Sequence, residues 1–331
     1  MTRVLVTGGA GFIGSELVGQ LADQGCDVLV IDNLVNGKRE NLAHLDPSRV
    51  RLVEADVRDA GALQSALADV DIVYHLACLG VRHSIHSPRE NHDVNATATL
   101  GLLALARAAR VSRFVYVSSS EVYGTARTVP MSEAHPTYPT TVYGASKLAG
   151  ECYTRAYHAT YGFPTVVVRP FNAFGPRSHH EGDSGEVIPK FLLRALAGRP
   201  MVVFGDGSQT RDFTFVSNTA AAIRAAGMEA SAVGETLNVG SGRAVSIAAL
   251  ARVVADVIGR PAEIVHEEPR PGDVHDLCAD MTKAGALLGF EPTVTLEDGL
   301  RRLHAWYVSE GASPAALLES EQVRNWVRAQ G

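Results

Sequence analysis

The chain has 331 residues, of which 46% are hydrophobic, and its 30 basic and 36 acidic side chains give a formal net charge of −6. This length supports a large core and two lobes, and the acidic balance without a long basic run argues against nucleic acid or a membrane surface as a partner. No apolar stretch reaches the roughly 18 residues that span a bilayer, and no signal peptide precedes the first expected strand. The sequence therefore predicts a soluble, cytoplasmic protein.

The cysteines show no C-x-x-C spacing, so we expect reduced thiols, no disulfide and no zinc site. They are widely scattered: Cys26, Cys78, Cys152 and Cys278. Two adjacent histidines, His179 and His180, have acids nearby, but neighbouring side chains seldom point into one site. No metal centre is therefore expected.

A glycine-rich turn follows the first expected strand. Residues 3–7 read Arg-Val-Leu-Val-Thr, a run that fits a buried parallel strand, and Gly8, Gly11 and Gly14 come directly after it. Residues 15–24 then carry apolar positions at helical spacing. In this order the amides at the start of the helix point back at the turn, where they can bind the pyrophosphate of a dinucleotide.

An acidic residue ends the second expected strand. That strand covers residues 27–31, and Asp32 follows it. A carboxylate at this place can accept hydrogen bonds from an adenosine ribose and repel a 2′-phosphate, so the sequence predicts NAD rather than NADP. Lys38 and Arg39 follow closely and could tolerate a phosphate, which keeps the alternative open.

Strands and helices alternate through the first half of the chain. Helical patterns separate further expected strands at residues 51–54, 72–76, 113–118 and 165–169. This alternation predicts an α/β fold, a Rossmann-like, doubly wound parallel sheet with helices on both faces. Two long apolar helices, residues 95–109 and 143–161, have more apolar surface than one sheet face needs. We expect a homodimer through a bundle of these helices, or else burial of both within one subunit.

The pattern changes after Arg169. A loop rich in His, Gly, Asp and Ser covers residues 175–185, and the later elements are shorter and less regular. We expect residues 1–170 to form the dinucleotide-binding domain and residues 171–331 a smaller α+β lobe that binds the substrate. Near residues 235–258 a strand pattern precedes a helix pattern, which predicts a return of the chain to the first domain.

Tyr143 and Lys147 form a Y-x-x-x-K pair downstream of three serines, residues 118–120. Four-residue spacing puts both side chains on one face of a helix, so the ammonium of Lys147 can lie near the phenol. A nearby cation lowers the pKa of a phenol, which is about 10 when free. Tyr143 could then take a proton from a sugar or alcohol hydroxyl while a hydride leaves the carbon. Such pairs occur by chance in many helices, and the N-terminal glycine turn is what gives this one weight.

With these residues in place, the chain resembles the extended short-chain dehydrogenase/reductase family, specifically its NAD-dependent nucleotide-sugar epimerases and dehydratases, such as UDP-glucose 4-epimerases and UDP-glucuronate decarboxylases. The resemblance covers nearly the whole chain, and so many segments in family order are more specific than any one alone. The matching segments are residues 6–14, 32–34, 55–59, 75–77, 118–124, 143–147, 169–172, 187–191, 209–213 and 270–273.

The resemblance implies a role for each matching residue. Tyr143, Lys147 and Ser119 would carry the proton transfer, and Tyr143 and Lys147 would also bind the nicotinamide ribose. The other residues implied in cofactor binding are Gly8, Gly11, Phe12, Ile13, Gly14, Asp32, Asn33, Asp56, Val57, Leu76, Ala77 and Asn95. Those implied in binding the nucleotide sugar are Ser120, Asn172, Val187, Arg211, Arg270 and Asp273.

The two arginines of this second set, Arg211 and Arg270, would clamp the diphosphate by charge-assisted hydrogen bonds. The plain alternative is an ordinary surface ion pair for each, because acids stand at Asp212 and Asp273. Family members of this kind share one opening step, in which the tyrosine removes the C4 hydroxyl proton while NAD takes the C4 hydride. Reduction of the ketone on its other face makes a 4-epimerase, which is the reaction we expect, with a UDP-sugar as the expected substrate.

Glu121 keeps a lyase reaction open. Dehydratases and decarboxylases of the family carry a glutamate there, and a carboxylate next to a 4-keto sugar could take the proton at C5. The alternative is a structural acid. Ser120 stands where the 4,6-dehydratases have the aspartate that protonates the leaving hydroxyl, and Glu186 stands where the decarboxylases have an arginine. Both departures disfavour a lyase. Ser120 is not the acid that protonates the leaving hydroxyl, and Glu186 would repel a glucuronate carboxylate.

Two segments are unusual for the family, residues 78–83 and residues 178–183. Both fall where the family builds its sugar pocket, so they could set an unusual sugar preference. Cys78 could act as an acid or base there, although a small buried residue is the plainer interpretation. A dinucleotide-binding protein without catalysis is the remaining alternative, and the retention of Tyr143, Lys147 and Ser119 argues against it.

Overall fold

The computed structural model describes residues 1–182, 184–259, 261–269 and 274–324, so Arg270 and Asp273, both predicted to bind substrate, lie outside the described residues. Its largest element is a seven-stranded sheet in which every strand pair is parallel. In spatial order the strands are β10 (Thr236–Val239), β6 (Thr165–Pro170), β5 (Arg113–Val117), β4 (Ile72–His75), β1 (Arg3–Thr7), β2 (Asp27–Asp32) and β3 (Val50–Glu54). The predicted Rossmann-like α/β class is confirmed.

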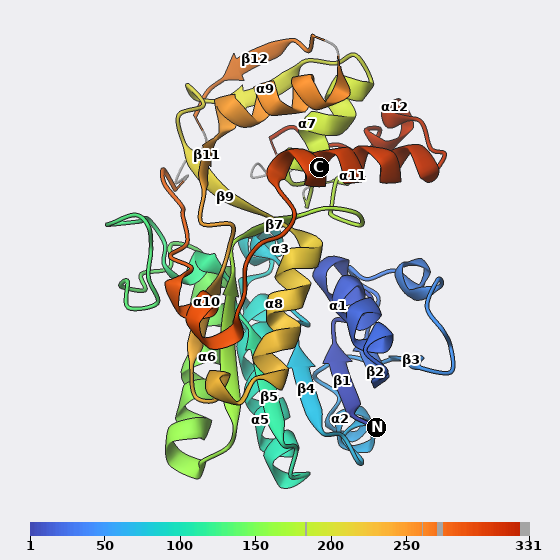
Figure 1. The fold of residues 1–331 in the computed structure, drawn as a ribbon, viewed down its shortest axis with the longest axis vertical. Coiled ribbons are helices and arrows are strands. Elements are labelled where there is room, and N and C mark those ends of the chain that lie inside the picture. Colours follow the sequence, from blue (N-terminus) through green and yellow to red (C-terminus); the bar gives the residue numbers. More distant parts are fainter. Residues whose placement is uncertain (183, 260, 270–273, 325–331) are drawn as a thin grey trace.

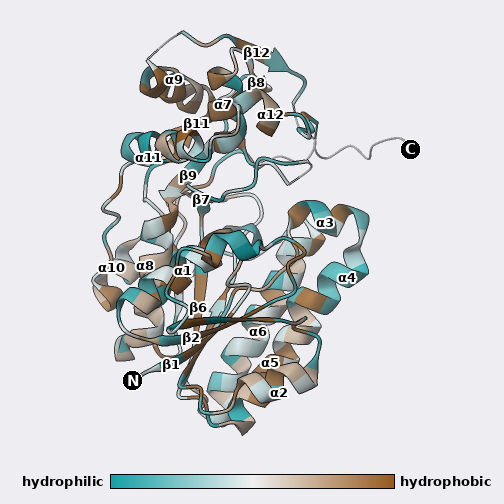
Figure 2. Ribbon diagram, turned by 90° about the vertical axis from the view of Figure 1, so that its right-hand side faces the viewer, coloured by the Kyte–Doolittle hydropathy of each residue, from teal (hydrophilic) through white to brown (hydrophobic). Residues whose placement is uncertain are grey.

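Helices cover both faces of this sheet. One face carries α1 (Phe12–Asp23) and α8 (Val216–Met228), with α10 (Thr282–Leu288) beside β10. The other face carries α2 (Ala60–Ala66), α5 (Ala98–Ala108) and α6 (Val142–Tyr161). The central strands β4 and β6 are buried at every residue, because a parallel sheet between two helix layers exposes neither face. Figure 2 shows hydrophobic strands of this sheet, with β1, β2 and β6 labelled, between the helices.

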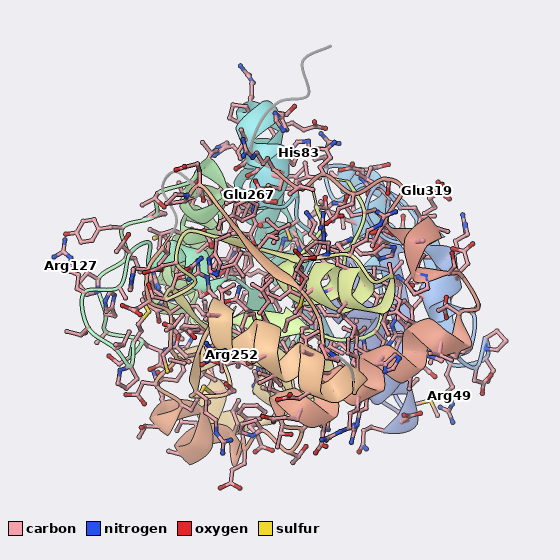
Figure 3. The ribbon with its side chains drawn as sticks, turned by 90° about the horizontal axis from the view of Figure 1, so that it is seen from above. Arg49, His83, Arg127, Arg252, Glu267 and Glu319 are labelled. Atoms are coloured by element: carbon pink, nitrogen blue, oxygen red, sulfur yellow. The ribbon has the colours of Figure 1, made fainter. Side chains whose placement is uncertain are left out.

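Short helical turns connect the longer elements. They are η1 (Arg39–Leu42), α3 (Val81–His86), α4 (Pro88–His92), η2 (Asp93–Thr97), η3 (Ser120–Val122) and η4 (Ala230–Ala232). The helix expected from residue 95 therefore begins as the π-helical turn η2 and becomes α-helical only at Ala98. The segment between η3 and α6 projects from the body of the molecule, with Arg127 extending outward (Figure 3).

A smaller lobe lies over the carboxyl ends of the sheet strands (Figure 1). Its strands form one sheet of β11 (Ala244–Ser246), β9 (Thr210–Phe215) and β7 (Asn172–Phe174) and a second of β12 (Ile264–Glu267) and β8 (Met201–Phe204). Its helices are α7 (Val187–Leu196), α9 (Ile247–Ile258), α11 (Leu296–Ser309) and α12 (Pro314–Leu317). These elements share an apolar core of their own, which Phe12 of α1 joins from the other lobe.

The chain crosses between the lobes in a way that differs from the expected return near residues 235–258. The strand of that segment, β10, does pair with β6 in the large sheet. The helix, α9, instead packs against α7 and α11 in the smaller lobe. The helices of this half that return to the sheet are α8, which precedes β10 and packs against α1, and α10, which packs against β10. The strand pattern of β10 identified its place, but an amphipathic helix pattern does not say which of two cores its apolar face joins.

Candidate active site

The glycine turn lies between β1 and α1. Gly8 has a φ of +73°, and a Cβ there would lie 2.6 Å from the backbone nitrogen of Ala77. A Cβ on Gly14 would collide with the carbonyl oxygen of Gly8. Gly11 precedes α1, whose first amides have no side-chain cap. Only glycine therefore lets the turn fold so closely against the loop after β4, and the uncapped helix end fits a pyrophosphate.

Asp32 ends β2 beside this turn and is only 7% exposed. Its carboxylate accepts hydrogen bonds from the backbone nitrogens of Ala10 and Leu34, each at 2.9 Å. Burial raises the pKa of this carboxyl, and the two backbone donors oppose the rise. Asp32 is therefore held rigidly at the place where an adenosine ribose is expected.

The two nearby cations that could accept a 2′-phosphate are both engaged. The ammonium of Lys38 lies 2.6 Å from the carboxylate of Glu181, which belongs to the smaller lobe. The guanidinium of Arg39 pairs with Glu54 at the end of β3. Because each cation has a carboxylate partner, the geometry favours NAD over NADP at this turn.

A cavity of about 960 Å³ is lined both by residues at the carboxyl ends of the sheet strands and by residues of the smaller lobe. It lies beside the neighbouring strands β1 and β4, where the chain order of the sheet reverses and where open α/β sheets bind their ligands. The predicted site residues that line it are Gly8, Gly11, Phe12, Ile13, Gly14, Asp32, Asn33, Val57, Leu76, Ala77, Ser119, Glu121, Tyr143, Lys147, Asn172, Val187 and Arg211.

Among the described residues, three predicted site residues do not line this cavity. The carboxylate of Asp56 accepts hydrogen bonds from Asn33 and from the guanidinium of Arg58, which lower its pKa to about 2. Ser120 is buried within η3. The third residue, Asn95, is also buried. It was predicted to bind the cofactor directly, but its side chain lies behind the cavity wall.

Asn95 holds the loop after β4 against α6. Its amide nitrogen lies 2.9 Å from the carbonyl oxygen of Leu79 and 3.1 Å from the hydroxyl of Ser146, and its amide oxygen accepts from the backbone nitrogen of Leu79. These bonds connect η2, the loop and α6, the helix that carries Tyr143. Asn95 therefore positions two walls of the cavity without facing it.

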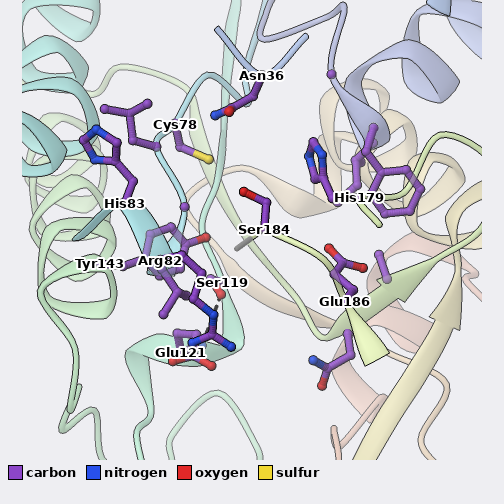
Figure 4. A pocket seen from close by; sticks show the side chains of 18 of the residues that line it. Asn36, Cys78, Arg82, His83, Ser119, Glu121, Tyr143, His179, Ser184 and Glu186 are labelled. Carbon is purple, nitrogen blue, oxygen red and sulfur yellow. Dashed lines mark hydrogen bonds between the residues drawn. The ribbon is translucent and has the colours of Figure 1, made fainter. Parts of the chain in front are cut away.

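Tyr143 and Ser119 meet at the floor of the cavity (Figure 4). Ser119 lies just after β5, and Tyr143 lies in the first turn of α6, where the hydroxyl of Thr141 accepts a hydrogen bond from the backbone nitrogen of Gly144. A side-chain hydrogen bond joins Ser119 to Tyr143. Two elements that are separate in sequence thus bring a hydroxyl and a phenol together.

The pKa of Tyr143 lies well above its ordinary value. Burial is the largest cause, followed by Cys78, while Glu121 and Glu186 add smaller increases and the hydrogen bond to Ser119 opposes them. The expectation that Lys147 holds this pKa down does not hold here. The ammonium of Lys147 instead donates to the carbonyl oxygen of Val117 at 2.6 Å, because β5 ends directly beside α6.

The sugar side of the cavity comes from the smaller lobe. Asn172 begins β7, and its amide oxygen is buried without a hydrogen-bond partner in the described part of the chain. Arg211 lies on β9 and lines the cavity. The surface ion pair considered for it is not formed with Asp212, whose carboxylate is fully buried and accepts from the backbone nitrogens of Ser241 and Gly242.

Several residues outside the predicted site set also line the cavity. Glu186 and His179 line it from the loop before α7, and His83 lines it from α3 with a buried ring nitrogen that has no partner among the described residues. His83 and His179 belong to the two segments expected in the sugar pocket, and Glu186 stands where the decarboxylases have an arginine, but the sequence pattern assigns none of the three a contact with the substrate. The neighbouring residue, His180, does not line the cavity. Its ring packs edge-on against the ring of Tyr307, with 5.9 Å between the ring centroids.

Two further features of the described residues bear on partners. None of their helices combines the length and the apolar character that crossing a membrane requires. They also contain no group of three or more His, Cys, Asp or Glu side chains arranged to hold a metal ion.

Comparison with known proteins gives a consistent class. The fold and the site define an extended short-chain dehydrogenase/reductase of the nucleotide-sugar epimerase and dehydratase type. A model of the GDP-mannose 4,6 dehydratase family matches residues 5–303, and this chain belongs to that family.

The relatives are named for different reactions. The UDP-glucose 4-epimerase of Mycolicibacterium smegmatis is 38% identical, with 91% of this chain and 96% of the relative covered. UDP-glucuronic acid decarboxylase 1 of Arabidopsis thaliana is 37% identical over 91% of this chain and 68% of its own. The family is therefore shown, while the particular reaction is not decided by similarity.

Solved structures agree with this division. A UDP-N-acetylglucosamine 4-epimerase from Methanobrevibacter ruminantium, solved with UDP-N-acetylmuramic acid, matches with a TM-score of 0.89 and 34% identity, covering 93% of this chain and 99% of that one. A dTDP-glucose 4,6-dehydratase from Streptomyces venezuelae, solved with NAD, matches with a TM-score of 0.86 and 34% identity, covering 93% and 97%.

Proposed function

We propose that this chain is a nucleotide-sugar 4-epimerase that acts on a UDP-sugar through a transient 4-keto sugar. The glycine turn and Asp32 would hold NAD, which would supply the hydride acceptor and donor for C4 when bound. The observation that carries the proposal is the hydrogen-bonded pair of Tyr143 and Ser119 at the floor of the cavity, next to the glycine turn. The epimerase relatives named for UDP-sugars support the choice of nucleotide.

The proton moves between the substrate and Tyr143. Because burial raises the pKa of this phenol, Tyr143 retains the proton that it has taken from the C4 hydroxyl until it returns that proton to the sugar 4-oxygen. In the opposite direction, the hydrogen bond to Ser119 favours the phenolate and so assists proton removal. The glycine turn and the sugar-side residues line one cavity of about 960 Å³, so the cofactor and the sugar would bind next to each other.

Lys147 is a buried cation that we propose assists the proton transfer by Tyr143. Its side chain is 2% exposed, and its ammonium lies 4.6 Å from the centroid of the Tyr116 ring. Burial lowers the pKa of Lys147, while Cys78 and Glu151 oppose the decrease. The proposed role is to bind the nicotinamide ribose and to hold a positive charge under the site.

The position of Glu121 supports a second candidate function, that of a nucleotide-sugar dehydratase or decarboxylase. Its side chain lines the cavity, and its charge contributes to raising the pKa of Tyr143, so it lies close to the reacting group. A carboxylate in that position can remove an activated proton at C5. The buried position of Ser120 argues against usual 4,6-dehydration, since no acid faces the leaving group there.

A reaction in deuterated water distinguishes the epimerase from the lyase. We expect the purified protein to convert a UDP-sugar to its 4-epimer without deuterium at C5, and Glu121→Gln to change the rate without changing the product. NMR and mass spectrometry of a panel of UDP-, dTDP-, GDP-, CDP- and ADP-sugars measure both. Deuterium at C5, or loss of water or carbon dioxide that disappears in Glu121→Gln, would replace the epimerase with a lyase.

We also propose a homodimer through α5 and α6, in the cytoplasm. Three large apolar side chains of these helices face outward: Leu100 at 37%, Val142 at 42% and Tyr161 at 52% exposure. Light scattering is expected to give twice the mass of one chain. Leu100→Glu is expected to give a monomer, because burying a charge in an apolar interface is costly, whereas Val308→Glu, on the exposed face of α11, leaves the dimer intact. A monomeric wild-type chain contradicts this assembly.

A further inference from the structure

Glu186 stands in the wall of the cavity opposite the reacting groups. It is the residue just before α7, and its side chain makes no capping hydrogen bond to the helix. Figure 4 shows Glu186 with His179 and Ser184 on one side of the cavity, and Tyr143 and Ser119 on the other. The two sides are electrostatically coupled, since the charge of Glu186 contributes to raising the pKa of Tyr143. A sugar bound for reaction therefore lies between them.

The surroundings of Glu186 disfavour its charged form. Burial raises the pKa of this carboxyl to about 8. The two cations on α7 are directed elsewhere, because the ammonium of Lys190 donates to the carbonyl oxygen of Gln322 at 2.7 Å and the guanidinium of Arg194 pairs with Glu321 at 2.9 Å.

Three other titratable groups of the described residues, Tyr143, Tyr307 and His179, do not compensate the charge of Glu186. Tyr143 of α6 and Tyr307 of α11 face it, and its charge raises the pKa of both phenols. His179 contacts it through the backbone, where the nitrogen of Glu186 donates to the carbonyl oxygen of His179 at 2.9 Å. Burial lowers the pKa of His179, so this imidazole is neutral at physiological pH.

We infer that Glu186 is a specificity-determining residue for the C6 group of the sugar: the site binds an uncharged C6 group at any pH, and a hexuronate only when Glu186 carries a proton. The inference rests on the proposed function and deepens it. C4 must reach Tyr143, and C6 is joined to C4 through C5 alone, so the C6 group stays within a few ångströms of the reacting carbon. Two carboxylates cannot share that space without repulsion, whereas a protonated carboxyl can donate a hydrogen bond to a carboxylate.

The test is binding of UDP-glucose and UDP-glucuronate, which differ only at C6, to the NAD-loaded protein by calorimetry from pH 6.5 to 9. We expect UDP-glucuronate affinity to fall about tenfold between about pH 7 and pH 9, as one linked proton requires, while UDP-glucose affinity stays constant. In Glu186→Gln both affinities are expected to be independent of pH. Glu319→Gln, an exposed carboxyl outside the cavity, is the matched control and should keep the wild-type profile.

Each outcome decides one question. A wild-type UDP-glucuronate affinity without pH dependence overturns the role of Glu186, and so does an unchanged fall in Glu186→Gln. If neither sugar binds at any pH, the proposed function fails and the inference fails with it. If both bind as expected but no 4-epimer forms, the reaction is wrong while the role of Glu186 stands.

Discussion

Tyr143→Phe is expected to lower kcat for the nucleotide-sugar reaction by about a thousandfold, within the range by which a positioned acid or base accelerates proton transfer. The substitution removes one oxygen and leaves the ring in the first turn of α6. The hydrogen bond to Ser119 is lost, but the cavity keeps its shape, so substrate KM and bound NAD should change little. Steady-state kinetics and the NAD absorbance of the purified variant measure the two effects separately.

Tyr138→Phe is the matched control for this variant. Tyr138 is 61% exposed on the projecting segment before α6, where the guanidinium of Arg127 lies 4.6 Å from its ring centroid. It does not line the cavity, so its loss should leave kcat unchanged. A Tyr143→Phe protein that is folded, retains NAD and turns over at the wild-type rate would show that another group moves the proton.

Arg169→Met is expected to destabilise the fold by about 3 kcal/mol, since the buried carboxylate of Glu151 loses its buried cation and keeps the part-exposed guanidinium of Arg155 as its ion-pair partner. Arg169 is 2% exposed at the end of β6, and its guanidinium donates to both carboxylate oxygens of Glu151, at 2.9 and 2.6 Å. It also donates to the phenol oxygen of Tyr123 at 2.8 Å. Urea unfolding followed by circular dichroism measures the loss.

Two control variants test whether the loss of stability comes from a charge that is both buried and unpaired. Glu151→Gln combined with Arg169→Met should recover part of the lost stability, because no charge then remains buried. Arg301→Met removes an exposed partner of Asp298, with the two side chains 62% and 55% exposed, and should cost less than about 1 kcal/mol. Equal losses for Arg169→Met and Arg301→Met would contradict this account of the β6–α6 contact.

The strands and the glycine turn were predictable because each is encoded locally. A β-branched run such as residues 3–7 has one favourable environment, a buried parallel strand, and the structure places β1 on those residues. The turn at Gly8 and Gly14 needs residues without a Cβ, and the close approach of Ala77 and of Gly8 itself supplies the reason. The acid at Asp32 follows from the same unit, because it ends the next strand of the same sheet.

Side-chain directions were less predictable. The four-residue spacing of Tyr143 and Lys147 correctly put both on the cavity face of α6, yet the partner of the Lys147 ammonium is Val117 on β5. Spacing along a helix sets which face a residue occupies, but not which neighbouring element supplies the nearest acceptor. The same limit explains Asn95, whose amide bonds to Leu79 across the chain rather than lining the cavity.

The sequence by itself determined the fold class, the glycine turn and the placement of Tyr143 and Lys147 on one face of α6, because hydrophobic period, glycine placement and helix spacing act over a few residues. Only the tertiary structure decided what encloses the site. Lys38 meets Glu181 across 143 residues of chain, α8 rather than α9 returns to the sheet, and Glu186 faces Tyr143 from the other lobe. These features depend on how two separate apolar cores dock, and docking matches surfaces that are distant in the chain and carry no common local pattern.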